Sequence, residues 1–344
     1  MRFGIFSVCD HYPAELPRTS GELYGELLEQ VVAAEALGFD SFWVAEHHFH
    51  EYGAIPSPPV FLAAAAQRTR RIRLGAAVVV LPFHDPLVVA EEYAMVDMLS
   101  GGRLDLGVGS GYLAHEFEGF GIPAAEKQAR FDEALETLLR AWTGERFSYE
   151  GRFVRVKDVK LNVQPVQRPR PPIWIAILRN EVAAAVGGRG FPIMMIPYAT
   201  AERVAEFAQT LGVWRTAYAA TGAAAAGASL PFGFHTYVGD GRAPAAAEAR
   251  QAMERYVRTR LYARQRPFET LLANDLIAFG GPEDVIRVAR RYEQCGYTDY
   301  LAIMNFGGLS QATVLRSMEM MARHVLPAFL REGGVSPPPG PPPN

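Results

Sequence analysis

Two patterns of apolar residues alternate along the chain. Short runs that are apolar throughout, such as residues 2–8 and 104–109, are followed by longer stretches in which apolar side chains recur every three or four residues. The runs are typical of strands buried on both faces, and the stretches are typical of amphipathic helices. The first helical stretch has signals at both ends, because Thr19 and Glu22 have capping-box spacing and Gly38 follows the last apolar position. We therefore expect strands that alternate with helices.

The alternation continues to the end of the chain. The expected strands are residues 2–8, 41–46, 73–81, 104–109, 172–177, 192–196, 232–238 and 300–304. After the first helix, further helices are expected at 60–70, 87–99, 131–142, 181–187, 201–220, 243–261, 282–295 and 310–330. Strands that are apolar on both faces and separated by helices indicate a parallel sheet in an α/β fold. The number of strand–helix units favours a closed (β/α)8 TIM barrel over an open, doubly wound sheet.

Two segments interrupt this rhythm. Residues 145–172 contain short alternating stretches and a proline-rich exit, which predict a β excursion before the fifth strand. Residues 262–281 show no clear periodicity and are expected to form an irregular lid before the last helices. Residues 1–331 are thus predicted to form one barrel domain. Residues 332–344, which are rich in proline and glycine, are expected to be a disordered tail.

Composition narrows the class of protein. Of 344 residues, 49% are apolar and 21% are charged, which is sufficient for a large core. The formal net charge of −3 gives no reason to expect a nucleic-acid or membrane partner, and no apolar run approaches the length of a membrane span. The N-terminus has the pattern of a strand and not of a signal peptide. Only two cysteines occur, with no Cys-x-x-Cys pair, so we expect a cytoplasmic protein.

Candidate chemistry lies where the expected strands end, because barrel enzymes place reacting groups at the C-terminal ends of their strands. Glu46, His47 and His48 follow the second strand. Adjacent side chains point in different directions, so at most one histidine faces the barrel mouth, where it could move a proton near neutral pH. A structural histidine bonded to a backbone carbonyl is the alternative. No third ligand occurs at a recognised spacing, so no metal site is predicted.

The fourth strand leads into a possible anion site. Gly109 and Ser110 lie in a glycine-rich turn, residues 107–111, whose backbone N–H groups could bind an anion. The turn lacks the last glycine of a dinucleotide fingerprint, so a Rossmann site is not favoured. Arg130, near the start of the next expected helix, could hold a phosphate or could pair with Glu126 or Glu133.

Two further segments have features of a cofactor site. Residues 178–181 connect the fifth strand to its helix, so the backbone N–H groups there, together with Arg179 and Asn180, would suit a phosphate. A solvated Arg179 is the alternative. Residues 75–78 in the third strand are small, which would let a flat ring approach the backbone, although ordinary barrel packing explains small residues equally well.

Together these segments resemble the luciferase-like flavin monooxygenase family over about residues 1–331. The resemblance is carried by blocks in a fixed order, the first of which ends in Glu46-His47-His48-Phe49; the blocks are residues 38–49, 80–86, 90–94, 97–109, 130–135, 172–176 and 315–319. The resemblance implies a TIM barrel that binds reduced FMN at the C-terminal ends of its strands. It also implies a monooxygenase that activates dioxygen as a C4a-peroxyflavin and oxygenates an organic substrate.

The resemblance also implies roles for single residues. His47 matches a histidine that lies beside the reactive flavin atoms in relatives and serves acid–base steps. Ala77 and Val78 match a pair that often carries a non-proline cis peptide bond behind the flavin ring. These two positions and His47 are therefore expected to surround the reacting part of the cofactor.

Phosphate contacts are implied at Arg130 and in the loop that contains Arg179 and Asn180. Many FMN-dependent relatives have arginine in place of Ser110 and small hydroxyl residues in place of Leu178 and Arg179. We therefore expect Arg179 to supply some of the missing charge. Gly-Ser-Gly at this strand also occurs in deazaflavin-dependent relatives, so a deazaflavin-dependent hydride-transfer enzyme is the alternative.

The same resemblance gives expectations for partners. A separate flavin reductase is expected to supply the reduced flavin, because the chain has no nicotinamide fingerprint, and a homodimer is expected to form through the barrel helices. Apolar residues around the mouth predict a small hydrophobic substrate that reacts with dioxygen. A non-catalytic flavin-binding protein is a further alternative, and the presence of His47 argues against it.

Overall fold

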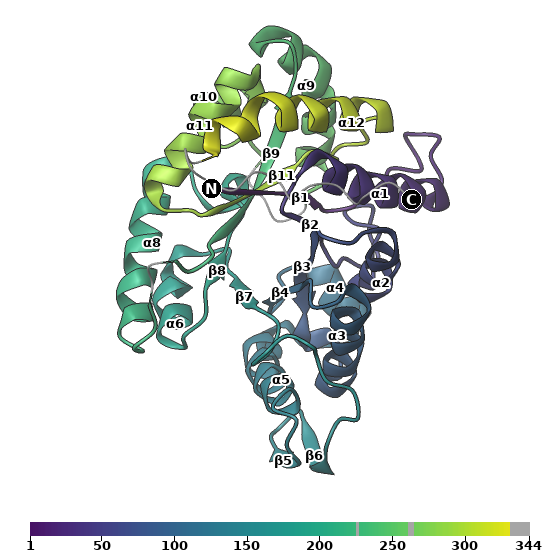
Figure 1. The fold of residues 1–344 in the computed structure, drawn as a ribbon, viewed down its shortest axis with the longest axis vertical. Helices are drawn as coiled ribbons and strands as arrows, with labels where there is room; N and C mark the ends of the chain where they lie inside the picture. The colour runs from purple at the N-terminus through teal and green to yellow at the C-terminus, as the bar shows by residue number, and fades with distance from the viewer. Residues whose placement is uncertain (225–226, 261–264, 331–344) are drawn as a thin grey trace, which may run out of the picture.

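The computed structural model describes residues 1–224, 227–260 and 265–330 of the chain (Figure 1). Parallel strands form a curled sheet in the order β9-β11-β1-β2-β3-β4-β7-β8, and Met195 after β8 pairs with Phe232 on β9, so that the two ends of the sheet meet. A strand occurs at each of the predicted places. The strands are β1 (Arg2–Ser7), β2 (Ser41–Val44), β3 (Arg73–Val80), β4 (Leu104–Gly109), β7 (Ile173–Ala176), β8 (Ile193–Met194), β9 (Pro231–Val238) and β11 (Asp299–Ile303).

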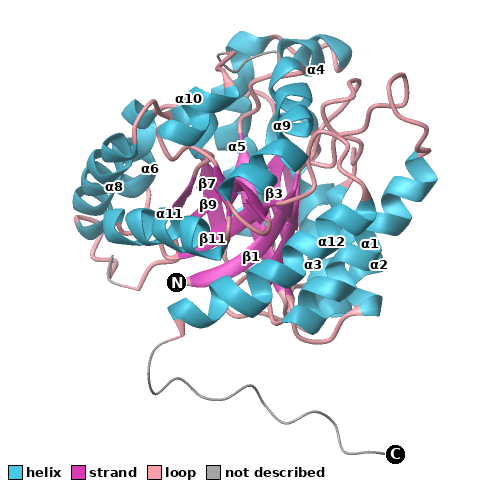
Figure 2. Cartoon of the chain, turned by 90° about the horizontal axis from the view of Figure 1, so that it is seen from above, coloured by secondary structure: helices cyan, strands magenta, loops and turns pink. Residues whose placement is uncertain are grey.

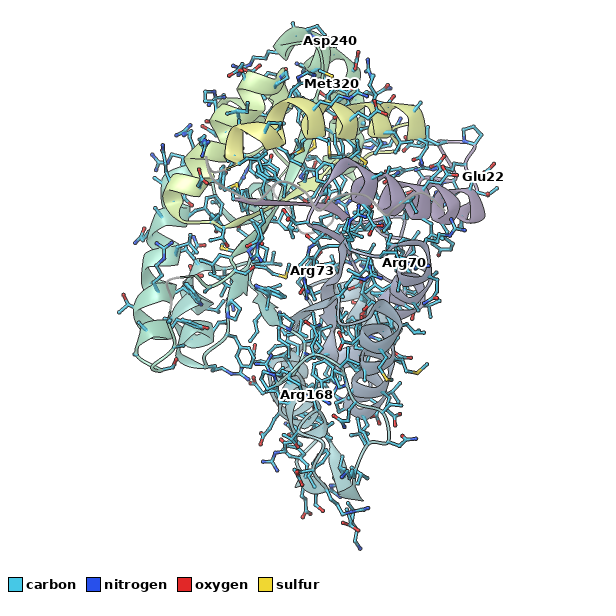
Figure 3. The ribbon with its side chains drawn as sticks, in the orientation of Figure 1. Glu22, Arg70, Arg73, Arg168, Asp240 and Met320 are labelled. Carbon is cyan, nitrogen blue, oxygen red and sulfur yellow. The ribbon has the colours of Figure 1, made fainter. Side chains whose placement is uncertain are left out.

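Helices surround this sheet (Figure 2). The predicted cap of the first helix is confirmed, because the Thr19 side chain accepts a hydrogen bond from the Glu22 backbone N–H and the Glu22 carboxylate accepts one from the Thr19 backbone. Figure 3 labels Glu22 at the start of that helix. The longer helices are α1 (Ser20–Leu37), α2 (Pro58–Arg68), α3 (Pro86–Ser100), α5 (Lys127–Ala141), α8 (Val204–Ala219), α9 (Arg242–Arg258), α11 (Pro282–Cys295) and α12 (Gln311–Met320). Shorter ones are α4 (Ala114–Gly119), α6 (Ala183–Gly188), α7 (Pro197–Thr200) and α10 (Phe268–Ala273).

An antiparallel pair of strands leaves the barrel before β7. β5 (Phe147–Glu150) pairs with β6 (Arg155–Val159), and the pair projects away from the sheet beside α5 at the bottom of Figure 1. The carboxylate of Glu133 on α5 accepts hydrogen bonds from the backbone N–H groups of residues 152, 153 and 154 at 2.9, 2.8 and 3.0 Å. A single carboxylate on α5 thus holds the turn between these two strands.

The expectation of an irregular segment at 262–281 was wrong for residues 268–273 and 278–280. Residues 268–273 form α10, and β10 (Ala278–Gly280) extends the sheet by pairing in parallel with β9. Both elements are too short to show a periodic pattern in the sequence. Residues 262–264 and the predicted tail at 332–344 lie outside the described residues.

An ion pair joins two neighbouring barrel strands near their N-terminal ends. Arg73, at the first position of β3 and near the centre of Figure 3, donates from Nε to both carboxylate oxygens of the buried Asp105 on β4, at 3.0 and 2.9 Å. This pair ties neighbouring strands together at the end of the barrel opposite the predicted site. Among the described residues, no helix has the length and apolar character needed to cross a membrane.

Candidate active site

His47 is buried just after β2, where it is paired with a carboxylate. Its Nδ1 is 3.1 Å from Oε1 of Glu116 on α4, and the same oxygen accepts a hydrogen bond from the backbone N–H of His48 at 2.9 Å. A carboxylate acceptor at Nδ1 fixes the tautomer in which Nδ1 carries the proton and Nε2 has a lone pair. Burial lowers the pKa of His47 below its ordinary value, against the opposing effect of Glu116. The imidazole is therefore neutral at neutral pH and can accept a proton at Nε2.

Two tyrosine rings hold the His47 ring at its edges. The Tyr52 ring lies 4.3 Å from the imidazole and the Tyr112 ring 6.2 Å away, both nearly perpendicular to it, and the two hydroxyls are 2.6 Å apart. The backbone of Gly53 lies close to the His47 side chain. A Cβ on Gly53 would lie 2.8 Å from Cβ of His47 and 2.9 Å from the backbone oxygen of Val8. The orientation of His47 thus depends on a glycine and on two aromatic rings.

The neighbouring histidine belongs to a different cluster. Oε1 of the buried Glu46 accepts hydrogen bonds from Nε2 of His48 at 3.1 Å and from Nε2 of His84 at 2.8 Å. Burial raises the pKa of Glu46, but the two histidine hydrogen bonds outweigh it and lower the pKa below its ordinary value. His84 supplies the third ligand that sequence spacing had not suggested, and the possible ligand atoms of Glu46, His48 and His84 lie within 4.8 Å of one another. The set could bind a metal ion, although each donor already has a hydrogen-bond partner.

The third strand runs next to β2 toward the same end of the barrel. Val44 pairs with Ala76, so Ala77 and Val78 follow on β3 at the level of Ala45 and Glu46, the two residues that precede His47. The peptide bond between Ala77 and Val78 is cis, as the resemblance implies. The flat ring that occupies the space beside Gly75 is Trp43, since a Cβ on Gly75 would lie 2.1 Å from its ring atoms. Packing therefore explains Gly75, and the cis peptide lies beyond it toward the mouth.

The predicted anion-binding residues do not all come together. Arg130 donates to Oε2 of Glu126 from Nε at 3.0 Å and from Nη2 at 2.9 Å, so it adopts the ion-pair alternative. Its guanidinium also lies 4.4 Å from the Phe153 ring centroid, beside a cavity of about 260 Å³ that includes His84. That cavity is lined neither by Ser110 nor by Arg179. The structure thus pairs Arg130 with Glu126 and places it beside this cavity.

A lysine that the sequence analysis missed lies at that turn instead. Nζ of Lys127, at the first position of α5, is 3.4 Å from the backbone oxygen of Gly111. Gly109 packs against Val78, because a Cβ there would lie 2.8 Å from Cγ2 of Val78. Arg179 is exposed and forms no ion pair with a described residue, while the buried Oδ1 of Asn180 has no hydrogen-bond partner among them. Lys127 thus lies at the turn after β4, and Arg179 has no described ion-pair partner.

A sequence model of the family described as luciferase-like monooxygenases matches residues 1–298. The chain belongs to the luciferase-like monooxygenase family. The resemblance found in the sequence is thereby confirmed. Among solved structures, monooxygenase RslO1 from Streptomyces bottropensis is 32% identical, covers 96% of this chain and 100% of its own, and superposes with a TM-score of 0.90.

Curated relatives of this luciferase-like protein include enzymes with two kinds of cofactor. The oxygenase component of a flavin-dependent trigonelline monooxygenase from Acinetobacter baylyi is 28% identical over 96% of each chain. An F420-dependent glucose-6-phosphate dehydrogenase from Amycolatopsis mediterranei is 33% identical over 50% of this chain and 54% of its own. The uncharacterized protein y4vJ from Sinorhizobium fredii is 40% identical, and the match spans about half of its length, 48%. The chain is therefore related to oxidoreductases that use a flavin or a deazaflavin.

A further solved structure shows the shared fold of the luciferase-like protein. The oxygenating constituent of 3,6-diketocamphane monooxygenase from Pseudomonas putida, in complex with FMN, gives a TM-score of 0.81 at 20% identity and covers 96% of this chain. At that identity the likeness shows the barrel architecture alone.

Proposed function

We propose that this chain is the oxygenase component of a two-component flavin monooxygenase. The observation that carries the proposal is the buried His47–Glu116 pair just after β2, beside the neighbouring strand β3 that carries the cis Ala77–Val78 peptide. In the proposed reaction, dioxygen accepts two electrons from reduced FMN. One oxygen atom enters the substrate, and the other leaves as water with two protons. The flavin-dependent oxygenase component from Acinetobacter baylyi supports this reaction class.

The residues at the barrel mouth fit a flavin with a phosphate tail. Ala77 and Val78 present a small surface on β3, and the Gly109 turn approaches Val78 without a side chain between them. Lys127 brings a positive charge to the turn, and the side-chain Nδ2 of Asn180 is a donor of the kind that a phosphate oxygen accepts. We assign the phosphate to Ser110, Lys127 and the loop at 179–180, with Arg130 able to contribute only if it leaves Glu126.

His47 handles the proton that this reaction requires. When bound, reduced FMN supplies the electrons that activate dioxygen, which no side chain of this site could do. Nε2 of His47 accepts or returns a proton next to the reacting atoms, and Glu116 stabilises the imidazolium that forms in between. Tyr52 and Tyr112 cover the edges of the imidazole and limit the access of water to it.

A deazaflavin-dependent hydride-transfer enzyme is the second candidate. It is favoured by Ser110, which lies where FMN-dependent relatives often have arginine, and by the F420-dependent relatives. The two candidates differ in whether dioxygen is consumed and in which cofactor binds.

An anaerobic titration distinguishes these candidates. Purified protein would be titrated with reduced FMN, with reduced riboflavin, which lacks the phosphate, and with reduced F420, and binding would be followed by flavin fluorescence. The proposal predicts that reduced FMN binds at least tenfold more tightly than either of the others. Preferential binding of F420 would establish the second candidate, and the absence of binding by all three would contradict both.

We also propose a homodimer that forms through α2 and α3. These neighbouring helices expose several large apolar side chains, which are unusual on a free surface; they are Val60, Val88, Met95, Met98 and Leu99. Light scattering should give twice the chain mass, and Met95→Glu should shift the protein toward the monomer.

A further inference from the structure

A buried arginine packs against Tyr52, the tyrosine whose ring also contacts His47. Arg260, two residues after α9, is only 1% exposed, and its guanidinium carbon lies 3.6 Å from the Tyr52 ring centroid and 3.5 Å from that of Tyr256. Its Nη1 donates to the backbone oxygen of Tyr52 at 3.0 Å. The centroid of the Tyr52 ring also lies 4.3 Å from that of His47, so the guanidinium and the imidazole contact the same tyrosine ring.

One edge of the Arg260 guanidinium has no partner. Nε and Nη2 are buried and find no hydrogen-bond acceptor among the described residues. A buried cation whose N–H groups lack acceptors is unfavourable, and neither stacking between two tyrosine rings nor the nearby charge of Asp10 supplies those acceptors. Nε and Nη2 point to the same side of the planar group, which is the arrangement that donates two parallel hydrogen bonds to one carboxylate. The free edge therefore has the geometry of a carboxylate-binding site.

Two other buried polar groups near Arg260 are also incompletely satisfied. Oδ1 of Asp10 has no partner among the described residues, although its Oδ2 accepts hydrogen bonds from Tyr12 Oη at 2.7 Å and from Gly307 N at 2.6 Å. Both ring nitrogens of His235 on β9 are likewise without a described partner, and its ring lies 4.4 Å from that of Tyr256. Buried polar groups in folded proteins nearly always have partners. Unpaired groups on three separate elements indicate a bound polar molecule.

We propose that Arg260 binds a carboxylate, or another delocalised oxyanion with two acceptor atoms, on the substrate that reacts beside His47. The assignment rests on the proposed function, because it takes His47 as the group next to the reacting atoms. It replaces the expectation of a purely hydrophobic substrate with an organic acid whose apolar body lies against Tyr52 and Tyr256. A reduced flavin is a second source of a delocalised anion, so the test includes it separately.

Binding measurements with matched acids and amides test this assignment. Calorimetry on the full chain would use benzoate, phenylacetate, cinnamate and octanoate, each paired with its primary amide, first without flavin and then with reduced FMN under anaerobic conditions. We expect at least one acid to bind tenfold or more tightly than its amide, because the amide cannot accept two charge-assisted hydrogen bonds. If no acid is preferred over its amide in either condition, the assignment is overturned.

Variants then connect the preference to Arg260. Arg260→Lys keeps the charge but loses the planar fork, so it should weaken the preferred acid about tenfold and leave the amide unchanged. Arg258→Lys is the matched control, because Arg258 is exposed and pairs with Glu15. Asp10→Asn provides a second variant if Arg260→Lys does not fold, and removing this nearby negative charge should tighten the binding of the acid several-fold.

Measurements with the acid and with reduced FMN distinguish a role of Arg260 in substrate binding from a role in cofactor binding. An Arg260→Lys protein that binds the acid normally but has lost affinity for reduced FMN would overturn the substrate assignment. The reaction of bound reduced FMN with dioxygen, measured on the same wild-type preparation, reports on the proposed function alone. A normal oxygen reaction without acid preference would thus remove Arg260 from substrate binding and leave the monooxygenase proposal intact.

Discussion

Replacing Glu116 with glutamine tests how His47 works. The substitution keeps an oxygen acceptor for Nδ1 of His47 and for the backbone N–H of His48, but removes the negative charge. Glutamine has nearly the same volume, so the packing of α4 should change little. The variant therefore isolates the charge of Glu116 from its shape.

The size of the effect follows from the two hydrogen bonds. Hydrogen bonds to a charged group are worth about 1.5–3 kcal/mol, against about 0.5–1.5 kcal/mol for neutral pairs, so the imidazolium form of His47 loses on the order of 1 kcal/mol. Burial already lowers the pKa of His47, and Glu116 opposes that effect. Removing the charge should lower the pKa of His47 further. A proton transfer that passes through the imidazolium should slow by about five- to tenfold.

The assay is a pair of pH profiles with a matched control. We expect the acidic limb of the rate profile to move to lower pH in Glu116→Gln, because His47 then stays neutral to lower pH, while the plateau rate falls. Nuclear magnetic resonance of labelled histidine would follow the imidazole directly. Glu118→Gln is the control, because Glu118 is exposed on the same helix. An unchanged His47 titration together with an unchanged rate in Glu116→Gln would refute the pairing as a functional element.

Three further predictions concern stability and cofactor binding. Burial, reinforced by Arg260, holds the pKa of His235 well below its ordinary value. Below about pH 6.5 the unfolded chain therefore binds a proton at this residue that the folded chain does not bind. The free energy of unfolding then falls with falling pH by up to about 1.4 kcal/mol per pH unit. Melting temperatures of His235→Gln should fall less steeply between pH 7 and pH 5 than those of wild type, and equal slopes would disprove this. Gly53→Ala should cost about 1–3 kcal/mol, because its Cβ would lie 2.9 Å from a backbone oxygen; Gly25→Ala, with nothing within 4 Å, should be harmless in the same thermal assay. Lys127→Met should weaken FMN about tenfold without affecting riboflavin, whereas a larger loss in Arg130→Met would favour the contact implied by the family resemblance.

Much of the fold could be predicted because barrel strands are buried on both faces and leave uninterrupted apolar runs. Capping residues fixed some helix ends closely, as at Thr19 and Ser310, whose side chains accept hydrogen bonds from backbone N–H groups of the first turn. The segment at 262–281 was misjudged, because a six-residue helix and a three-residue strand are shorter than the window in which periodicity can be read. Short elements are defined by their tertiary partners.

The candidate site could be predicted only where it coincides with strand ends or family motifs. His47 follows a strand directly, so its position at the mouth could be inferred. Glu116 is 69 positions away from it, and Arg260 is 208 positions away from the Tyr52 carbonyl it contacts. Neither residue stands in a pattern that signals its role. Arg130 is a different case, because its residue type suits both a phosphate and an ion pair, and the structure shows it paired with Glu126, one helical turn away.

The most direct test of the central claim is the reaction of the bound reduced flavin with dioxygen. Wild-type protein and His47→Ala, each loaded anaerobically with reduced FMN, would be mixed with oxygenated buffer in a stopped-flow spectrometer. The account predicts a transient absorbance, distinct from those of reduced and oxidised FMN, that persists for seconds in wild type and decays at an altered rate in His47→Ala. Direct conversion to oxidised FMN at the rate of free flavin, identical in the two proteins, would contradict it.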